Sequence, residues 1–252
     1  MMRLLMLVLL FFSFIAKADD CSYSRKIERS IDIPELTSLK VLARAGTLKI
    51  IGDKGSDEIR IDAKLCASRK KNLKKMDVLF TNNGQLGILK TDIPDSNGLW
   101  FSGTNSIDLS IKVPERMVLD VDDSSGSVLI QDVAALKIVD SSGSLSIKGV
   151  AGDLGLRDSS GSIDIDQVAG SVVLSDSSGG ISITNVSDDV LIKGDSSGSI
   201  LVKNVGGDFV VNQDTSGSIS AINIGRHFWV RRDSSGGINY KNVGGKVDIP
   251  KN

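Results

Sequence analysis

One four-residue phrase, Asp-(Ser/Thr)-Ser-Gly, occurs seven times in the second half of this 252-residue chain. Successive copies are 17, 18, 18, 19, 19 and 19 residues apart. A period of this regularity is typical of repeat architectures, in which each unit packs only on its neighbours. The copies begin at Asp123, Asp140, Asp158, Asp176, Asp195, Asp214 and Asp233.

The apolar residues around the phrase align in five columns, two before it and three after it. In the second copy they are Leu136, Ile138, Leu145, Ile147 and Val150. The paired columns are two residues apart, which is the period of a strand and not of a helix. Each unit therefore predicts a strand, a Ser-Gly corner, a second strand and a second turn. We expect an all-β fold, a parallel β-solenoid (β-helix) with two-strand coils of about 18 residues, in which the columns become buried ladders. A flexible Ser/Gly linker would lack such columns.

The repeated Asp is the candidate for special chemistry. Alternation from Leu136 and Ile138 points Asp140 and Ser142 inward. Carboxylates stacked at a coil spacing of about 4.8 Å would repel by about 3–4 kcal/mol at an effective dielectric near 20.

Three arrangements relieve this repulsion: cations between the carboxylates, partial protonation, or turn hydrogen bonds from the Ser and Gly N–H groups while the charge reaches solvent. We favour the turn hydrogen bonds. Calcium stays the less favoured alternative. The known calcium-binding solenoid repeat is a nonapeptide far richer in Gly, and this chain does not match it. The seven Asp residues of the phrase are then the only candidate metal ligands, and no other cofactor is expected.

The first 18 residues predict a signal peptide. Arg3 precedes an apolar run that ends near Ile15, and small residues at Ala16 and Ala18 suit a cleavage site. The run is too short to span a bilayer, so no transmembrane segment is expected after signal removal. Removing Arg3 and Lys17 leaves 28 basic against 31 acidic side chains, a net charge of −3. This balance argues against a nucleic-acid partner.

The rest of the chain predicts one continuous domain with two sections. Residues 19–116 alternate less regularly and predict irregular coils or a cap, and residues 117–252 form the regular solenoid. The two cysteines, Cys21 and Cys66, are expected to form a disulfide in an oxidising compartment, the periplasm, the medium or the cell surface.

The chain resembles the bacterial putative-adhesin family of exported β-strand-repeat proteins. The resemblance covers about residues 38–249 and rests on the Ala45-Gly46-Thr47-Leu48-Lys49-Ile50 opening, the Ser110-Ile111-Lys112-Val113-Pro114 segment and the seven phrases. It implies a β-solenoid fold. Where many relatives would carry Thr or a small residue before Ser-Gly, this chain carries Asp each time.

These features favour a non-enzymatic, adhesin-like binding or cell-envelope scaffold protein whose partner is an envelope protein or a glycan. The alternative is a carbohydrate-active β-helix enzyme, a polysaccharide lyase or hydrolase. Such enzymes carry their catalytic groups on long loops, which steps of 17–19 residues do not allow. We assign no catalytic and no cofactor-binding residue, and we expect the single histidine, His227, at the surface.

Three further features have ordinary explanations. The basic cluster from Arg69 to Lys75 predicts a short helix or loop in solvent, although it could meet an anionic surface. Trp100 and Phe101 are more typical of a closed core than of a sugar platform. A water-ordering face would need uniform outward residues, whereas these vary: Lys137, Arg157, Ser175 and Lys193.

Overall fold

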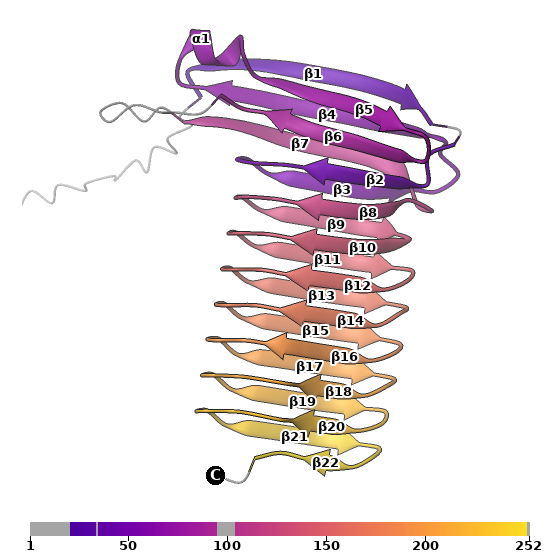
Figure 1. Ribbon diagram of the computed structural model, residues 1–252, viewed down its shortest axis with the longest axis vertical. Helices are drawn as coiled ribbons and strands as arrows, with labels where there is room; N and C mark the ends of the chain where they lie inside the picture. The colour runs from indigo at the N-terminus through magenta and orange to yellow at the C-terminus, as the bar shows by residue number, and fades with distance from the viewer. Residues whose placement is uncertain (1–20, 34, 95–103, 251–252) are drawn as a thin grey trace, which may run out of the picture.

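The computed structural model describes residues 21–33, 35–94 and 104–250. The predicted signal peptide, with Trp100 and Phe101, lies outside these residues. The chain forms two 11-stranded sheets that stack face to face along a rod (Figure 1). The predicted parallel β-solenoid is confirmed.

The first sheet begins with strands of the N-terminal section and continues through the second strand of every regular coil. Its order is β1 (Tyr23–Asp32), β4 (Glu58–Ala67), β7 (Asn105–Pro114), β3 (Leu48–Asp53), β9 (Val128–Val133), β11 (Leu145–Val150), β13 (Ile163–Val168), β15 (Ile181–Val186), β17 (Ile200–Val205), β19 (Ile219–Ile224) and β21 (Ile238–Val243).

The second sheet contains the first strand of every coil. Its order is β5 (Asp77–Asn83), β6 (Leu86–Asp92), β2 (Ser38–Leu42), β8 (Val118–Asp122), β10 (Ala135–Val139), β12 (Leu154–Arg157), β14 (Val172–Ser175), β16 (Val190–Gly194), β18 (Phe209–Val211), β20 (Phe228–Val230) and β22 (Val247–Asp248). From β8 and β9 onward, every pairing within the two sheets is parallel and in register by column.

The apolar columns form the core between the sheets. Leu136, Ile138, Leu145, Ile147 and Val150 are each at most 3 % exposed. The last coil differs, because no coil lies beneath it: Tyr240, which belongs to the fourth column, is 52 % exposed. The rod therefore ends in an uncovered coil.

The N-terminal section closes the opposite end of the rod. Strands β1 and β4 and strands β4 and β7 pair antiparallel, as do β5 and β6. The helix α1 (Lys70–Leu73) lies over this end (Figure 1). Strands β2 and β3, however, pair in parallel with β8 and β9 and complete a regular coil. The first coil of the solenoid is thus built from residues that lie in the sequence between the cap strand β1 and the cap strands β4 to β7.

Each Ser-Gly corner requires glycine, as predicted. Gly143 has a φ of 130°, a region that side chains rarely adopt. A Cβ added to Gly143 would lie 1.7 Å from the carbonyl oxygen of Gly126 in the preceding coil. The first 19-residue step also produces the expected irregularity, because the register shifts where Ser175 pairs with Gly194.

Candidate functional site

The repeated aspartates form a column inside the rod. Six of them are at most 6 % exposed, and Asp233, in the uncovered last coil, is half-buried. Together with Thr91 they are the buried polar residues of the described chain. Strand alternation places them there, since Val121 and Asp123 point inward and Asp122 points to solvent. The inward direction predicted for Asp140 is confirmed, whereas Ser142 is half-exposed and its hydroxyl donates to the carbonyl of Ser124.

One oxygen of most of these carboxyls caps its own corner. Oδ1 of Asp140 accepts from the N–H of Ser141 at 2.8 Å, and Oδ1 of Asp158 accepts from the N–H of Ser159 at 2.7 Å. The Gly N–H takes no part, because that of Gly143 donates to the carbonyl of Ser160 in the next coil. The predicted hydrogen bonds from Ser N–H groups to the Asp carboxyls are therefore present. The prediction that the Gly N–H also donates to the Asp carboxyl is wrong.

The expectation that the charge reaches solvent is also wrong. Oδ2 of Asp140, Asp158, Asp176 and Asp195 is buried and has no hydrogen-bond partner, and both oxygens of Asp123 and Asp214 are in this state. The corner does not turn the side chain outward, because the Asp continues the inward alternation of the strand before it. Each carboxyl thus has at least one buried oxygen without a partner.

Burial raises the pKa values of the six buried carboxyls, and neighbouring carboxyls add to the shift for each of them except Asp158. The pKa of Asp123 rises to about 7, and the pKa values of Asp140 and Asp195 rise to about 6. The pKa values of Asp158, Asp176 and Asp214 are raised as well, mainly by burial. The column therefore holds its protons to a higher pH than an ordinary Asp does.

The column begins at the cap with uncharged residues. The pairing of β2 with β8 and of β2 with β6 places Ala43 beside Asp123, and Thr91 beside Ala43. Thr91 satisfies its hydroxyl on the carbonyl of Leu42 at 3.4 Å. Carboxylates occupy this position only from β8 onward.

The column does not form a polydentate metal centre. Within residues 21–33, 35–94 and 104–250, no group of three or more His, Cys, Asp or Glu side chains is placed to hold a metal ion. The calcium assignment to the seven Asp residues thus gains no support from this geometry.

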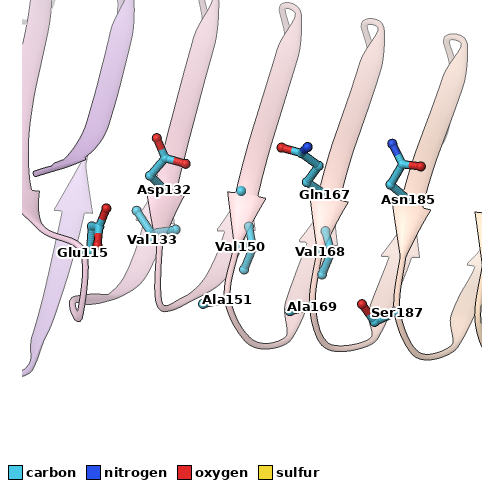
Figure 2. A pocket seen from close by; sticks show the side chains of 11 residues that line it. Glu115, Asp132, Val133, Val150, Ala151, Gln167, Val168, Ala169, Asn185 and Ser187 are labelled. Atoms are coloured by element: carbon cyan, nitrogen blue, oxygen red, sulfur yellow. The ribbon is translucent and has the colours of Figure 1, made fainter. Parts of the chain in front are cut away.

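A groove runs across the second corners of four consecutive coils (Figure 2). Its volume is about 540 Å³. Figure 2 shows the polar side chains of Asp132, Gln167 and Asn185 in a row, with Glu115 at one end and the coil of Val150 between Asp132 and Gln167. The small side chains of Ala151, Ala169 and Ser187 and the valines beside them complete the lining.

The groove exists because one corner lacks a side chain. The residue before the fifth apolar column is left-handed in every coil, with φ values of 57° at Asp132, 71° at Gly149 and 62° at Gln167. Gly149 leaves a hollow between its two polar neighbours. From Asn185 onward the same position forms a ladder: Asn204 donates to Asn185 at 3.0 Å, and Asn223 donates to Asn204 at 2.8 Å. The groove ends where this ladder begins.

The groove carries negative charge and no positive charge. Glu115 and Asp132 are exposed, and no Lys or Arg lines the groove. In the described part of the chain, their carboxylates and the Gln167 amide make no hydrogen bond or ion pair with protein. These groups are available to an external partner. Sequence reasoning missed the groove, although the Gly149 interruption of an Asp/Gln/Asn column was a visible signal.

A second hollow, the acidic pocket, lies at the rim of the cap. It is lined by Asp32, Asp53, Lys54, Gly55, Ser56, Asp57, Glu58 and Arg60 and has a volume of about 470 Å³. Several of its charges are already paired. Glu58 bonds with Ser30 and Arg60, which lower its pKa, and Asp57 forms an ion pair with Arg116 at 2.8 Å.

A family model described as Toastrack DUF4097 matches residues 50–242. The chain belongs to the Toastrack family. Solved structures similar to this Toastrack chain include a putative adhesin from Bacteroides fragilis, at 15% identity and a TM-score of 0.52, which covers 90% of this chain and 97% of that one. That likeness shows a shared fold.

Two further structures align over 90% of the Toastrack chain. A putative lipid binding protein from Parabacteroides distasonis is 17% identical, with 97% of its chain covered and a TM-score of 0.49. A putative cell adhesion protein from Clostridium sporogenes is 14% identical, with 99% covered and a TM-score of 0.33. The resemblance to the putative-adhesin family is confirmed by the Toastrack match over residues 50–242 and by the fold shared with the Bacteroides fragilis protein. No curated protein matches the chain significantly.

The remaining predicted residues have structural roles in this Toastrack protein. The disulfide between Cys21 and Cys66 is confirmed and joins the start of β1 to the end of β4. His227 is half-buried. Its Nδ1 accepts from the N–H of Lys246 at 2.8 Å, and its ring stacks on Trp229 with centroids 5.0 Å apart. The basic cluster lies on and beside α1 with Lys70, Lys71, Lys74 and Lys75 exposed.

None of the helices in the described residues has the length and apolar character needed to cross a membrane.

Proposed function

We propose that this protein is a non-enzymatic, exported β-solenoid that acts as an adhesin-like binding or cell-envelope scaffold protein, with the groove of Figure 2 as its contact surface. The observation that supports this best is the row of polar side chains above a floor of small residues, in which Glu115, Asp132 and Gln167 have no partner within the described residues of the protein. A rigid scaffold holds that row across four coils, so an extended partner can follow it without ordering the protein first.

The chemistry of the groove restricts the partner. Glu115 and Asp132 would repel an anionic ligand, and Gln167 offers both donors and an acceptor. The groove suits a neutral or cationic extended chain rich in hydrogen-bonding groups. A neutral glycan and a basic segment of an envelope protein both have this character.

Export is supported by two features. Residues 1–18 have the pattern of a signal peptide. The Cys21–Cys66 disulfide is consistent with an extracytoplasmic location, the periplasm, the medium or the cell surface. The structurally similar protein from Bacteroides fragilis is described as a putative adhesin.

A glycan array and a pull-down from envelope extract test the proposal, with Gly149→Asn as the decisive variant. Asn at this position should fill the hollow without backbone strain, because Asn185 and Asn204 have the same left-handed backbone, and the Asp132 carboxylate must turn aside to admit it. The nearest atom to the new Cβ is the mobile Oδ1 of Asp132 at 2.4 Å. We expect the variant to lose retention about tenfold or more while its thermal stability is unchanged.

The matched control is Lys137→Ser, an exposed change on β10 in the other sheet. It should retain the same glycan or protein as the wild type. Equal retention by Gly149→Asn and wild type would place binding elsewhere, and no retention by any form would leave a purely structural role.

The carbohydrate-active alternative would use the acidic pocket, which gathers carboxylates with basic residues as such an enzyme requires. The bonds of Glu58 with Ser30 and Arg60 oppose this role, because they lower the pKa of Glu58. A general acid needs a carboxyl with a raised pKa. Release of new reducing or unsaturated ends from polysaccharides, abolished by Asp53→Asn, would favour the enzyme over the binding protein.

A further inference from the structure

The interior aspartate column places acidic groups of adjacent coils next to one another. Parallel bridges join Asp195 with Asp214 and Asp214 with Asp233, and the register of β10 with β8 places Asp140 beside Asp123. In these adjacent coils, both carboxyl oxygens of Asp123 and Oδ2 of Asp140 are buried without a hydrogen-bond partner. A hydrogen bond between two carboxyls requires that one of them carries a proton.

Within the described residues, no buried Lys, Arg or His lies beside these charges. In the described chain, the buried polar and charged residues are Thr91 and the aspartates of the column, and both sheets otherwise present apolar side chains to the interior. The charged groups that act on the column are its own members and Asp122. The nearby basic residues Arg44, Arg157 and Arg232 are exposed.

The unpartnered oxygens therefore need either a cation or a proton. A calcium ion takes six to eight oxygen ligands. Here the corner offers N–H donors instead: Oδ1 of Asp158 faces the N–H of Ser159, and the hydroxyl of Ser160 turns to the carbonyl of Ser141. A buried corner with N–H groups favours a proton over calcium, because a shared proton needs only one donor oxygen and one acceptor oxygen.

The same rod shows that coil spacing suits such a bond. In the exposed ladder, amide groups of consecutive coils bond at 2.8–3.0 Å, as from Asn223 to Asn204 and from Asn204 to Asn185. A protonated carboxyl can donate across one coil in the same way, from its O–H to the free oxygen of the next Asp.

We propose that the interior Asp column is a proton ladder, in which carboxyls of adjacent coils share protons and so make the folded rod more stable in mildly acidic medium. The protons come from solvent when the chain folds. They return to solvent on unfolding, because an exposed Asp is ionised near neutral pH.

The sign of the pH effect follows from proton binding. Folded Asp123, with a pKa of about 7, and folded Asp140 and Asp195, with pKa values of about 6, keep their protons to a higher pH than in the unfolded chain, where the pKa of an Asp is 3.8. The free energy of unfolding therefore decreases as the pH rises from about 4 to about 7. Glu58 and Asp166 act in the opposite direction, since their pKa values are lowered.

The test measures thermal unfolding of the purified protein between about pH 5 and about pH 8, for the wild type and for Asp140→Asn/Asp158→Asn/Asp176→Asn. Asn keeps the acceptor oxygen and adds a neutral donor in place of the proton. We expect the wild-type Tm to fall by about 5 °C or more toward the higher pH, and the variant to have a higher Tm at pH 8 and a flatter profile. Asp164→Asn, an exposed change in the same coil as Asp158, should keep the wild-type profile.

A second measurement does not depend on the variant. Infrared spectra of wild-type protein near pH 6 should show the band of protonated carboxyl groups. Ordinary aspartates do not contribute to this band at pH 6, because they are already ionised. Absence of that band, or a variant that keeps the full wild-type pH profile, would overturn the proposal. So would a Tm at pH 8 that chelator lowers and calcium restores, because the column would then hold cations.

Discussion

The ring of Phe228 stacks on the ring of Phe209 in the preceding coil, with centroids 5.1 Å apart and planes 15° from parallel. Both rings are 0 % exposed. We expect Phe228→Ala to lower the free energy of unfolding by about 3–5 kcal/mol, through lost burial and a cavity between the sheets. Phe228→Leu should cost about 1–2 kcal/mol. Urea unfolding measures both, and Tyr240→Ala, at a half-exposed ring, should cost less than either.

The corner glycines are positions at which we expect an added side chain to destabilise the fold. Gly143→Ala should destabilise by about 3 kcal/mol or more, because its Cβ would meet the carbonyl oxygen of Gly126 and its φ is left-handed. Gly155→Ala is the matched control within β12, since an added Cβ there meets nothing within 4 Å. It should change stability by less than about 1 kcal/mol. Similar losses for the two variants would show that the corner tolerates a side chain.

The asparagine ladder allows hydrogen bonding and backbone conformation to be separated. Asn204→Gly keeps the left-handed backbone and removes two side-chain hydrogen bonds, at a cost of about 1–2 kcal/mol. Asn204→Ala removes the same bonds and adds about 1 kcal/mol of backbone strain. Denaturant unfolding should therefore rank wild type, Asn204→Gly and Asn204→Ala in that order. The reverse order of the two variants would contradict this account.

Loss of the disulfide should act on the cap. Cys21→Ser/Cys66→Ser removes a bond that closes 45 residues and stabilises by about 3–4 kcal/mol in the chain-entropy model. Strand β1 pairs only with β4, so its amides should exchange with solvent first. Hydrogen exchange should show faster β1 and β4 and unchanged β13 and β15. Equal acceleration throughout the rod would show that cap and coils unfold together.

The regular coils could be predicted because the apolar period of two and the repeated phrase report the same geometry. Leu136, Ile138 and Leu145 lie in the core as expected. The placement of β2 and β3 could not be predicted in this way. Their partners β8 and β9 follow 80 residues later, as Ser38 pairs with Val118 and Leu48 with Val128. The cap strands between them have no phrase to align.

For the Asp column, the sequence predicts the inward direction of the side chains but not whether their oxygens are buried. Alternation gave the inward side chain of Asp140, but whether its second oxygen reaches water depends on how the neighbouring coil covers the corner. That oxygen is buried without a partner. The groove depends on a missing side chain at Gly149, which becomes visible only when the left-handed corner residues are aligned with one another.

The two ends of the rod respond differently to mechanical load. The last coil, with β21 and β22, is covered on one side only, whereas the first coil lies under an antiparallel, disulfide-linked cap. Tension applied at the C-terminal end would therefore release coils one after another from β22 upward. Each step would free 19 residues in the last coils, or about 65 Å of extended chain, and the cap would open last. A rod pulled in this way would lengthen in such steps while its capped end stayed folded.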